Sequence, residues 1–490
     1  MVASLDPAIC EQARLSRDRR FDGRFFVAVV TTGVYCRPVC PVPPPKPENV
    51  RFYPSAAAAE AAGFRPCLRC RPETAPGSAA WQGVDVSVQR ALRLIAEGAL
   101  DGAPLTALAA RLGIGERYLR KLFERHVGAS PLAVAQTRRL QLAKQLLDDS
   151  GLAMTAVAAA AGYGSLRRFN AAFERCYGRP PSQLRRSHST GLGLRLLLRY
   201  RPPLHWQQFV DRLQLRLIPE IERLNEQGYC RSYRHAGGHG WLRLRPLTNE
   251  DALELTLDCA ATIAIGPLVA RLRRQFDLDS EPQLISDWLA RDPLLQPLLQ
   301  RWPGLRLPAA FDPFEQAVRT VIGQQVSVKA AITLCRRLVQ RLGQPLPQAA
   351  AEQPGWLFPT PEAIAEGNLD GLGLTNKRVE TLRQLAAAVA SGALPLNAEQ
   401  GSERLHQALC QLPGIGDWSA SYLALRGCAE PDELPVGDLG LRKAAIWGPE
   451  GISARALAEH GQRWRPWRSY AAVYLWQSYS HGPLSDGEPC

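Results

Sequence analysis

The sequence lacks any run of about 18 consecutive apolar residues, the length that a helix needs to cross a membrane. Its start also lacks a basic segment followed by an apolar stretch, so we expect no secretion signal. Together these absences predict a protein of the reducing cytosol with no membrane partner.

Cysteine is scarce, with 12 residues in a chain of 490. In a reducing compartment, cysteines that cluster are more often metal ligands or reactive groups than disulfide partners. Two close pairs, Cys36–Cys40 and Cys67–Cys70, form such a cluster, whereas the other eight are scattered and are interpreted as core or surface residues.

Lysine is also rare, and the net positive charge of the chain is distributed unevenly. Only six of the 59 basic residues are lysine, which is typical of an arginine-rich proteome. Residues 1–190 hold 27 Lys and Arg against 15 Asp and Glu, whereas the remaining residues hold 32 against 31. Arginine bias does not explain this asymmetry, which favours a polyanionic partner of the front part, most simply nucleic acid.

A chain of this length is expected to form about three or four domains. Residues 24–36 read as strand, turn and strand, and residues 55–64 as a short helix with a Ser N-cap. Helical patterns at 105–128 and 154–178 give two helix-turn-helix units, joined by a long helix from about 131 to 149. A period-two hairpin follows at 241–258, and residues 311–476 are helical. Linkers are predicted at 74–80 and 187–194.

The two cysteine pairs suit one tetrahedral Zn²⁺ site made of Cys36, Cys40, Cys67 and Cys70. A segment of about 75 residues has a small core, so a metal would add folding energy that it needs. The alternative is a set of unrelated buried thiols, which this paired spacing disfavours.

The stretches TTGVYCRPVCP, RFYPS and AAGFRPCLRCRP resemble the N-terminal domain of the bacterial Ada-type adaptive-response regulator over about residues 8–73. The resemblance implies that Cys36 accepts a methyl group from a DNA phosphotriester, and that Thr32, Arg65 and Arg69 approach the DNA backbone. Zinc keeps a thiol deprotonated, and the thiolate is the nucleophile. Methylation of Cys36 would remove one negative charge from the site, and should therefore tighten its binding to DNA.

Residues 161–186 resemble the AraC-type DNA-binding domain through Gly162-Tyr163, Phe169, Phe173, Gly178 and Pro181. Phe169 and Phe173 are four residues apart on one helix face, so we expect them in the core. The recognition helices are predicted at about 116–126 and 165–176. Their candidate phosphate or base contacts are Arg117, Arg120, Lys121, Arg167 and Arg168. The alternative is a solvated basic face.

The stretch LPGIGDWSASYLALRG (412–427) predicts a helix-hairpin-helix, in which Gly414 and Gly416 let bare backbone approach DNA phosphate. Asp438 follows in a loop that enters a helix. The hairpin and the downstream Asp are typical of the helix-hairpin-helix DNA glycosylase superfamily. Residues 305–331 and 463–476 extend the resemblance to the AlkA-type 3-methyladenine DNA glycosylase II, over nearly all of residues 192–485.

By this resemblance Asp438 is the catalytic carboxylate, and Trp418, Tyr422 and Trp476 line the base pocket. Gln325 occupies the position of the wedge that fills the vacated base stack; it is an amide here instead of a large apolar residue. A base alkylated on a ring nitrogen is cationic and leaves easily, so flipping, an aromatic pocket and a carboxylate at the sugar suffice. Asp438 would stabilise an oxocarbenium-like sugar and orient the attacking water.

Three further absences refine this interpretation. Trp418 stands where lyase members of the superfamily carry a lysine, so no Schiff base can form there and a monofunctional glycosylase is expected. The three cysteines after residue 400 are too few for a four-cysteine iron–sulfur cluster, so none is expected. No cysteine is followed by His-Arg, so the second methyl acceptor of many Ada-type regulators is missing.

We therefore expect a mainly α, multidomain fusion acting in DNA alkylation repair and transcription activation. The predicted domains are a small α+β zinc domain (1–75), an all-α AraC-type pair (84–188), an α+β glycosylase N-terminal domain (192–305) and an all-α helix-hairpin-helix domain (306–485). The expected partners are double-stranded DNA and RNA polymerase, in the cytoplasm of a bacterium. Two alternatives stay open: a glycosylase that its front domains only dock on DNA, and a regulator with an inactive glycosylase fold.

Overall fold

The computed structural model describes residues 6–76, 86–185, 194–235, 238–259, 265–346, 353–399 and 401–481. The chain divides into two compact units. The first unit comprises Met1–Pro202, Arg234–Arg273 and Leu278–Glu281, and the second comprises Pro203–Tyr233, Arg274–Asp277 and Pro282–Cys490. Both predicted linkers, 74–80 and 187–194, fall mostly outside the described residues.

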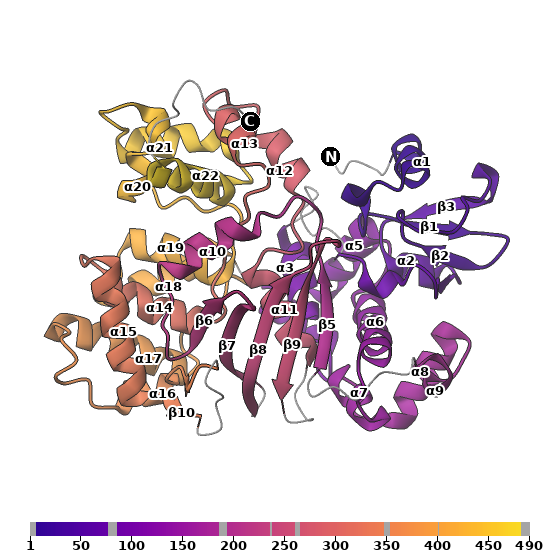
Figure 1. Cartoon of the computed structure of the whole chain (residues 1–490), viewed down its shortest axis with the longest axis horizontal. Helices are drawn as coiled ribbons and strands as arrows, with labels where there is room; N and C mark the ends of the chain where they lie inside the picture. The colour runs from indigo at the N-terminus through magenta and orange to yellow at the C-terminus, as the bar shows by residue number, and fades with distance from the viewer. Residues whose placement is uncertain are drawn as a thin grey trace. The chain divides into compact units, whose positions relative to one another are not determined.

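The first unit begins with a small α+β region built on four short strands (Figure 1). Its elements are α1 (Pro7–Ser16), η1 (Arg19–Phe21), β1 (Phe26–Val29), β2 (Val34–Cys36), η2 (Pro47–Asn49), β3 (Val50–Tyr53), α2 (Ala56–Ala61), β4 (Arg65–Pro66) and η3 (Pro72–Thr74). The strand order is β3-β1-β2-β4, with β1 and β2 antiparallel as the sequence predicts. The predicted N-cap of α2 is confirmed, because the Ser55 side chain accepts a hydrogen bond from the Ala58 amide.

Helices follow in the first unit, in the predicted arrangement of two helix-turn-helix pairs around one long helix. They are α3 (Val86–Ala96), α4 (Leu105–Arg111), α5 (Glu116–Val127), α6 (Pro131–Asp149), α7 (Met154–Ala160), α8 (Leu166–Tyr177) and α9 (Pro181–Leu184). The expectation for Phe169 and Phe173 is confirmed: both rings are fully buried, with centroids 5.6 Å apart.

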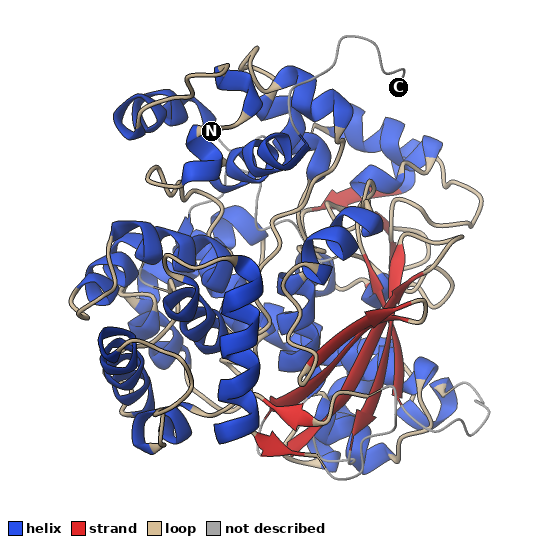
Figure 2. Ribbon diagram, turned by 60° about the vertical axis from the view of Figure 1, so that its left-hand side comes forward, coloured by secondary structure: helices blue, strands red, loops and turns tan. Residues whose placement is uncertain are grey.

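A five-stranded sheet with flanking helices comes next in the chain, drawn with the other strands in red in Figure 2. Its elements are β5 (Leu194–Arg199), α10 (Trp206–Gln214), β6 (Glu222–Asn225), β7 (Gly228–His235), β8 (Gly238–Pro246), β9 (Ala252–Cys259), α11 (Ile265–Gln275), α12 (Pro282–Leu289) and α13 (Gln296–Arg301). The order is β5-β9-β8-β7-β6. The predicted hairpin is β8–β9, in register Trp241↔Asp258 to Pro246↔Leu253.

The remaining elements, all in the second unit, are helical except for one pair of short strands. Its elements are α14 (Pro313–Gly323), α15 (Val328–Leu342), β10 (Gln344–Pro345), β11 (Trp356–Leu357), α16 (Pro361–Glu366), α17 (Asn376–Ala390), α18 (Ser402–Cys410), α19 (Asp417–Cys428), α20 (Leu439–Arg442), η4 (Ala445–Trp447), α21 (Ala454–His460), η5 (Gly461–Trp464) and α22 (Arg468–His481). A large apolar core includes Val318, Leu338 and Leu423 of α14, α15 and α19. The two-residue strands β10 and β11 interrupt the predicted helical region.

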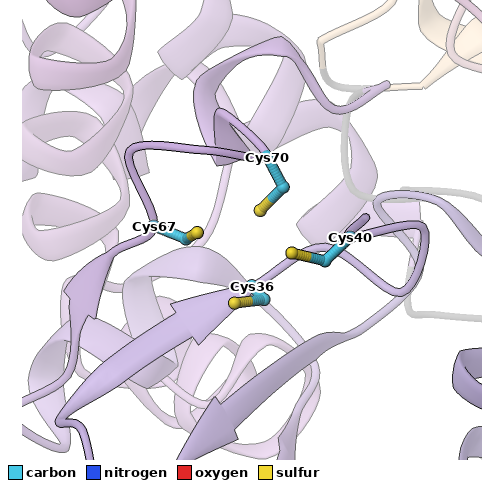
Figure 3. Close-up of side chains that lie close together, drawn as sticks. All are labelled: Cys36, Cys40, Cys67 and Cys70. Atoms are coloured by element: carbon cyan, nitrogen blue, oxygen red, sulfur yellow. The ribbon is translucent and has the colours of Figure 1, made fainter. Parts of the chain in front are cut away.

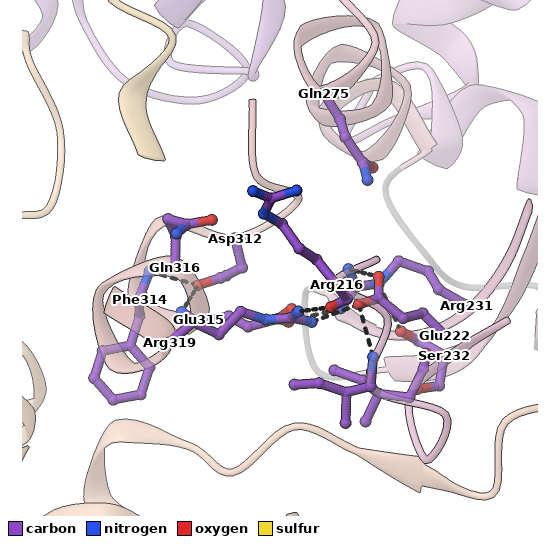
Figure 4. A network of polar contacts seen from close by, with 12 residues as sticks. Arg216, Glu222, Arg231, Ser232, Gln275, Asp312, Phe314, Glu315, Gln316 and Arg319 are labelled. Carbon is purple, nitrogen blue, oxygen red and sulfur yellow. Dashed lines mark hydrogen bonds and ion pairs between the residues drawn. The ribbon is translucent and has the colours of Figure 1, made fainter. Parts of the chain in front are cut away.

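A buried ion cluster fixes α14 against β6 and β7 (Figure 4). The Arg319 guanidinium binds Glu222 and Glu315 at 2.6 Å each, and Arg231 binds Glu315 at 2.7 Å. Burial alone would raise the pKa of Glu222, but the charges of Arg319 and Arg231 outweigh it and hold that pKa below its usual value. This cluster (Glu222, Arg231, Glu315 and Arg319) is called the buried ion cluster below.

Within the described ranges, none of the helices combines the length and the apolar character that a membrane span requires.

Candidate functional sites

Strand pairing brings together the first member of each cysteine pair. Strands β2 and β4 are parallel neighbours, with Tyr35 opposite Pro66. Cys36 ends β2 and Cys67 directly follows β4, so the two lie at the same end of the sheet. The pairing of two short strands thus brings two separate sequence segments together.

Two tight turns add the remaining cysteines. The Cys40 amide donates to the Arg37 carbonyl at 3.1 Å, and the Arg71 amide donates to the Cys67 carbonyl at 3.2 Å. All four sulfur atoms lie within 4.8 Å of one another and point toward a common centre (Figure 3). Sulfurs on a tetrahedral Zn²⁺ ion are about 3.8 Å apart, so this donor set fits zinc.

Arg37, between the first two cysteines, is a structural residue. Its guanidinium is buried, forms an ion pair with Asp22 and donates to Thr74 Oγ1 at 2.8 Å. Its backbone N–H points at Cys70 Sγ, 3.4 Å away. N–H donors to sulfur stabilise thiolates, so this turn contributes to the electrostatics of the cluster as well as to its shape.

The sulfurs influence one another's protonation. A hydrogen bond with Cys40 raises the pKa of the Cys36 thiol, and the same contact lowers the pKa of Cys40 to about 7. Contact with Cys36 also lowers the pKa of Cys67. The four sulfurs are therefore close enough to share protons, and a bound Zn²⁺ ion, which takes thiolates, would displace those protons.

A groove of about 610 Å³ opens onto the cluster. Its lining includes Cys36, Cys40, Cys67, Thr32 and Arg17. Thr32, one of the residues predicted to approach the DNA backbone, thus lines the same groove as Cys36. No sequence motif marks Arg17; its backbone is in the left-handed region and turns the chain at the end of α1.

The other predicted contacts of the front part are exposed. Arg65 and Arg69 face solvent but do not line the groove. Arg117, Arg120, Lys121, Arg167 and Arg168 are all exposed on α5 and α8. Arg120 is paired with Glu116 one turn earlier, at 2.6 Å, so it is less available than its neighbours.

In the second unit, Asp438 lies at the centre of the predicted aromatic group. Its Oδ2 accepts from the Trp418 indole Nε1 at 3.0 Å, and its Oδ1 accepts from the Trp476 indole Nε1 at 2.9 Å. Oδ1 also accepts from the Leu441 amide at 3.1 Å, so Asp438 is the N-cap of α20. A carboxylate has about four lone-pair sites, so these three donors leave one for a water or a substrate.

The aromatic rings form one connected group. Trp418 and Tyr422 stack one helical turn apart on α19, with centroids 5.1 Å apart and planes 15° apart. Tyr422 meets Trp476 edge to face at 6.0 Å. All three and Asp438 are half-buried, so they are packed yet reachable. The direct indole bonds to Asp438 were missed by the sequence analysis, because nothing in the spacing of residues 418, 438 and 476 indicates which edge of a ring meets the carboxylate.

The hairpin between α18 and α19 needs glycine at Gly414. Its φ is +89°, and a Cβ there would lie 2.3 Å from Thr381 Oγ1. At Gly416, the N-cap of α19, no neighbour of this chain lies within 4 Å of such a Cβ. That openness leaves room for a partner at the helix N-terminus.

A second turn is tied to this hairpin. The Gln324 side-chain amide donates to the Gly414 carbonyl at 2.9 Å and to Ser419 Oγ at 3.2 Å. The next residue, Gln325, is exposed and has φ +54°, an uncommon conformation for a residue other than glycine. Gln324, which no sequence motif marks, therefore anchors the turn that presents Gln325.

Comparison with known families matches four of them along the chain. Residues 9–73 match the metal binding domain of Ada, and residues 108–187 match a helix-turn-helix domain. Residues 195–312 match the AlkA N-terminal domain, and residues 318–455 match the HhH-GPD superfamily of base excision DNA repair proteins. Together with the two sites, these matches define a base-excision repair protein fused to a metal-binding, helix-turn-helix regulator.

Relatives of full length specify the class further. The chain is 40% identical to the probable bifunctional transcriptional activator/DNA repair enzyme AlkA of Mycobacterium tuberculosis, over 98% of each chain. It therefore belongs to the family of bifunctional transcriptional activator/DNA repair enzymes of the AlkA type. Its predicted resemblances and fold class are confirmed.

Other relatives match one part of the chain. The DNA-3-methyladenine glycosylase 2 of Escherichia coli is 32% identical over 58% of this chain and 97% of its own length. The solved 3-methyladenine DNA glycosylase from Archaeoglobus fulgidus superposes with a TM-score of 0.52, at 20% identity, over 59% of this chain and 99% of that chain. The latter likeness establishes the fold of this part.

Proposed function

We propose that this chain serves the response to DNA alkylation in two ways. Its rear part (residues 192–485) hydrolyses the N-glycosidic bond of alkylated bases. Its front part (residues 1–190) accepts a methyl group from DNA phosphotriesters and activates transcription. The observation that carries the proposal is the Asp438 carboxylate, half-buried and held by two indole N–H groups and one backbone amide.

Asp438 acts at the sugar. Three donors fix the plane of its carboxylate, and the remaining lone pair accepts a hydrogen bond from a water. As the C1′–N bond breaks, its electron pair leaves with the base, and the negative charge of Asp438 stabilises the cationic sugar. The water oxygen then bonds to C1′, and its proton passes to the carboxylate.

The aromatic group of Trp418, Tyr422 and Trp476 selects the flipped base. Ring faces attract a base that carries positive charge, as one alkylated on a ring nitrogen does. Trp418 and Trp476 thus have two tasks, since their indole N–H groups also orient Asp438. Trp418 supplies no amine for a Schiff base, which supports hydrolysis without strand cleavage.

The front part acts once per molecule. Zinc bound by Cys36, Cys40, Cys67 and Cys70 would keep the thiols deprotonated and hold them in place. The Cys36 sulfur attacks the methyl carbon of a methylphosphotriester; an S–C bond forms, the C–O bond breaks, and the phosphodiester leaves as an anion. Thr32 and Arg17 in the groove, with Arg65 and Arg69 on either side of Cys67, contact the flanking phosphates.

The helix-turn-helix pairs read the promoter. Exposed Arg117, Lys121, Arg167 and Arg168, with Arg120 released from Glu116, contact DNA, and RNA polymerase is the protein partner. On this proposal the domains run as the sequence predicts, over 1–75, 84–188, 192–305 and 306–485, in the cytoplasm of a bacterium. Gln325 fills the gap left by the flipped base, and Gly414 and Gly416 hold the backbone.

One incubation with methylated DNA tests both activities. Wild type should release 3-methyladenine and gain one methyl group at Cys36, located by peptide mass spectrometry. Asp438→Asn keeps the cap geometry and should lower base release by about 10²–10⁴-fold while methyl uptake continues. Asp312→Asn, at the N-cap of α14, is the matched control and should release base normally. Normal base release by Asp438→Asn would refute the catalytic assignment.

A transcription assay distinguishes this proposal from the alternative in which the front part only docks the glycosylase on DNA. Cys36→Ala should abolish methylation-induced transcription from the target promoter while base release continues. If induction persists in Cys36→Ala, the front part only docks the glycosylase on DNA.

A further inference from the structure

A second group of metal-binding side chains lies beside the hairpin, apart from both sites above. His406 and Cys410 are one turn apart on α18, so they share a helix face. Asp417, the first residue of α19, reaches them across the hairpin. His406 Nε2 lies 3.1 Å and Cys410 Sγ lies 3.8 Å from Asp417 Oδ1. The three ligand atoms all lie within 4.8 Å of one another.

The spacing of these atoms suits a four-coordinate ion. Around tetrahedral Zn²⁺, an imidazole nitrogen and a carboxylate oxygen are about 3.3 Å apart, and a sulfur and an oxygen are about 3.6 Å apart. The observed separations differ from these by a few tenths of an ångström. A nitrogen, a sulfur and an oxygen donor together favour a borderline-soft divalent ion over Mg²⁺ or Ca²⁺, which take oxygen ligands.

An ion pair alone accounts poorly for this arrangement. An exposed His–Asp contact contributes about 0–1 kcal/mol and does not require a thiol beside it. The Asp417 side chain is 94% exposed, so one side of the group is open. Three protein ligands with an open fourth position are the usual composition of a zinc site that also binds an outside ligand.

We infer that His406, Cys410 and Asp417 bind one divalent ion of the Zn²⁺ class, whose open position accepts water or a DNA phosphate oxygen. On binding, the Cys410 S–H bond breaks, an S–metal bond forms, and the proton goes to solvent. The ion neutralises the Asp417 carboxylate, which otherwise repels phosphate at the N-terminus of α19. The effect on DNA rests on the proposed hairpin contact; the ion binding does not.

Metal counting tests the site. The full chain, with its four-cysteine cluster loaded with zinc, is equilibrated with micromolar Zn²⁺ and measured by native mass spectrometry. Wild type should hold one more zinc ion than either His406→Ala or Cys410→Ser. Cys428→Ser is the matched control, since Cys428 lies near the end of α19 with its sulfur directed at the Leu396 carbonyl; it should hold as much zinc as wild type.

Cobalt gives a second readout. Co²⁺ added to the zinc-loaded chain should produce a sulfur-to-cobalt charge-transfer band, which Cys410→Ser abolishes and Cys428→Ser keeps. The site is refuted if wild type and Cys410→Ser bind equal metal, or if the band is the same in both. Circular dichroism of each variant detects misfolding, and His406→Asn replaces His406→Ala if the latter is unfolded.

The effect on DNA is measured on an undamaged duplex, where no base is released. Zn²⁺ should tighten binding by wild type about tenfold, the change that about 1.4 kcal/mol produces. Asp417→Asn should bind as tightly without added zinc. Unchanged affinity in wild type would refute the charge role. Because no excision is involved, this result is independent of whether Asp438 proves catalytic.

Discussion

The four-cysteine cluster and the Asp438 cluster differ in how the chain holds them. All four cysteines lie between residues 36 and 70, on short strands and tight turns around a small core. Asp438 is held by side chains of α19 and α22, at residues 418 and 476, inside a unit with an extensive apolar core. We therefore expect the four-cysteine site to depend on a bound ion for its stability, and the Asp438 site to depend on packing.

This difference also matches the two proposed chemistries. A methyl acceptor is altered by its reaction, so its site must tolerate a change of charge at one sulfur. A hydrolase must return to its starting state, and three N–H donors around one carboxylate resist any lasting change. The buried ion cluster of Glu222, Arg231, Glu315 and Arg319 cross-links α14 to β6 and β7 in the second unit, much as a bound zinc ion would cross-link the two cysteine pairs.

The largest effect should come from removing zinc. Strong chelation should unfold the region of β1–β4, because structural Zn²⁺ sites contribute about 10–16 kcal/mol to folding. Hydrogen exchange should show lost protection around Tyr35 and Ala59 but unchanged protection in α14 and α19. Base release should continue at the normal rate.

The control for chelation is re-addition of zinc, which should restore protection around Tyr35. If protection there survives full removal of zinc, the small core alone is sufficient, and the contrast between the two sites fails.

A smaller effect should follow from breaking the buried ion cluster. Arg319→Met removes a partner at 2.6 Å from both Glu222 and Glu315, which leaves two buried carboxylates to share Arg231, and should destabilise the second unit by about 3–5 kcal/mol. Hydrogen exchange of α14 measures this loss. Arg455→Met removes an exposed pair with Glu459 and should cost at most about 1 kcal/mol. Equal losses in the two variants would mean that burial of these charges has no special weight.

Much of the fold follows from local sequence signals. The bounds of α6, the Ser55 cap and the β8–β9 hairpin agree with expectation because periodicity and caps are properties of short segments. The β10–β11 pair escaped prediction since two-residue strands have no periodicity. The four cysteines were grouped correctly because their spacing is itself the signal of a metal site.

The rear site was predicted only as a set of residues. The motifs indicate that Asp438 and its aromatic neighbours belong together, but ring orientation depends on the packing of α19 against α22. For the same reason, neither the hydrogen bonds of Gln324 to the hairpin nor the left-handed backbone of Gln325 could be predicted from the sequence. His406 and Cys410 have helical spacing, but Asp417 reaches them across a turn. A regular residue spacing therefore does not predict this cluster.

The indole bonds to Asp438 should have a still smaller, measurable effect. Trp476→Phe keeps an aromatic ring but removes the N–H, and should lower kcat for base release by about 10–100-fold, the equivalent of about 1.5–3 kcal/mol. Trp418→Phe should behave likewise, with KM changing less than kcat. Trp356→Phe, on β11, is the control and should keep its rate. A change confined to KM would mean that these residues only stack on the base.

The smallest expected effect is the loss of stability of the second unit at acidic pH. The pKa of Glu222 is held below its usual value of 4.5 in the folded state. Its contribution to stability is therefore fully present above about pH 4.5 and is lost as pH falls through the folded-state pKa. The difference in unfolding free energy between wild type and Glu222→Gln should shrink as pH falls below 4.5. Glu226→Gln, at an exposed position nearby, should differ from wild type by the same small amount at every pH. If the difference between wild type and Glu222→Gln stays constant on acidification, packing and not charge accounts for the contribution of the buried ion cluster to stability. The second unit then has no electrostatic counterpart of the zinc expected in the first unit.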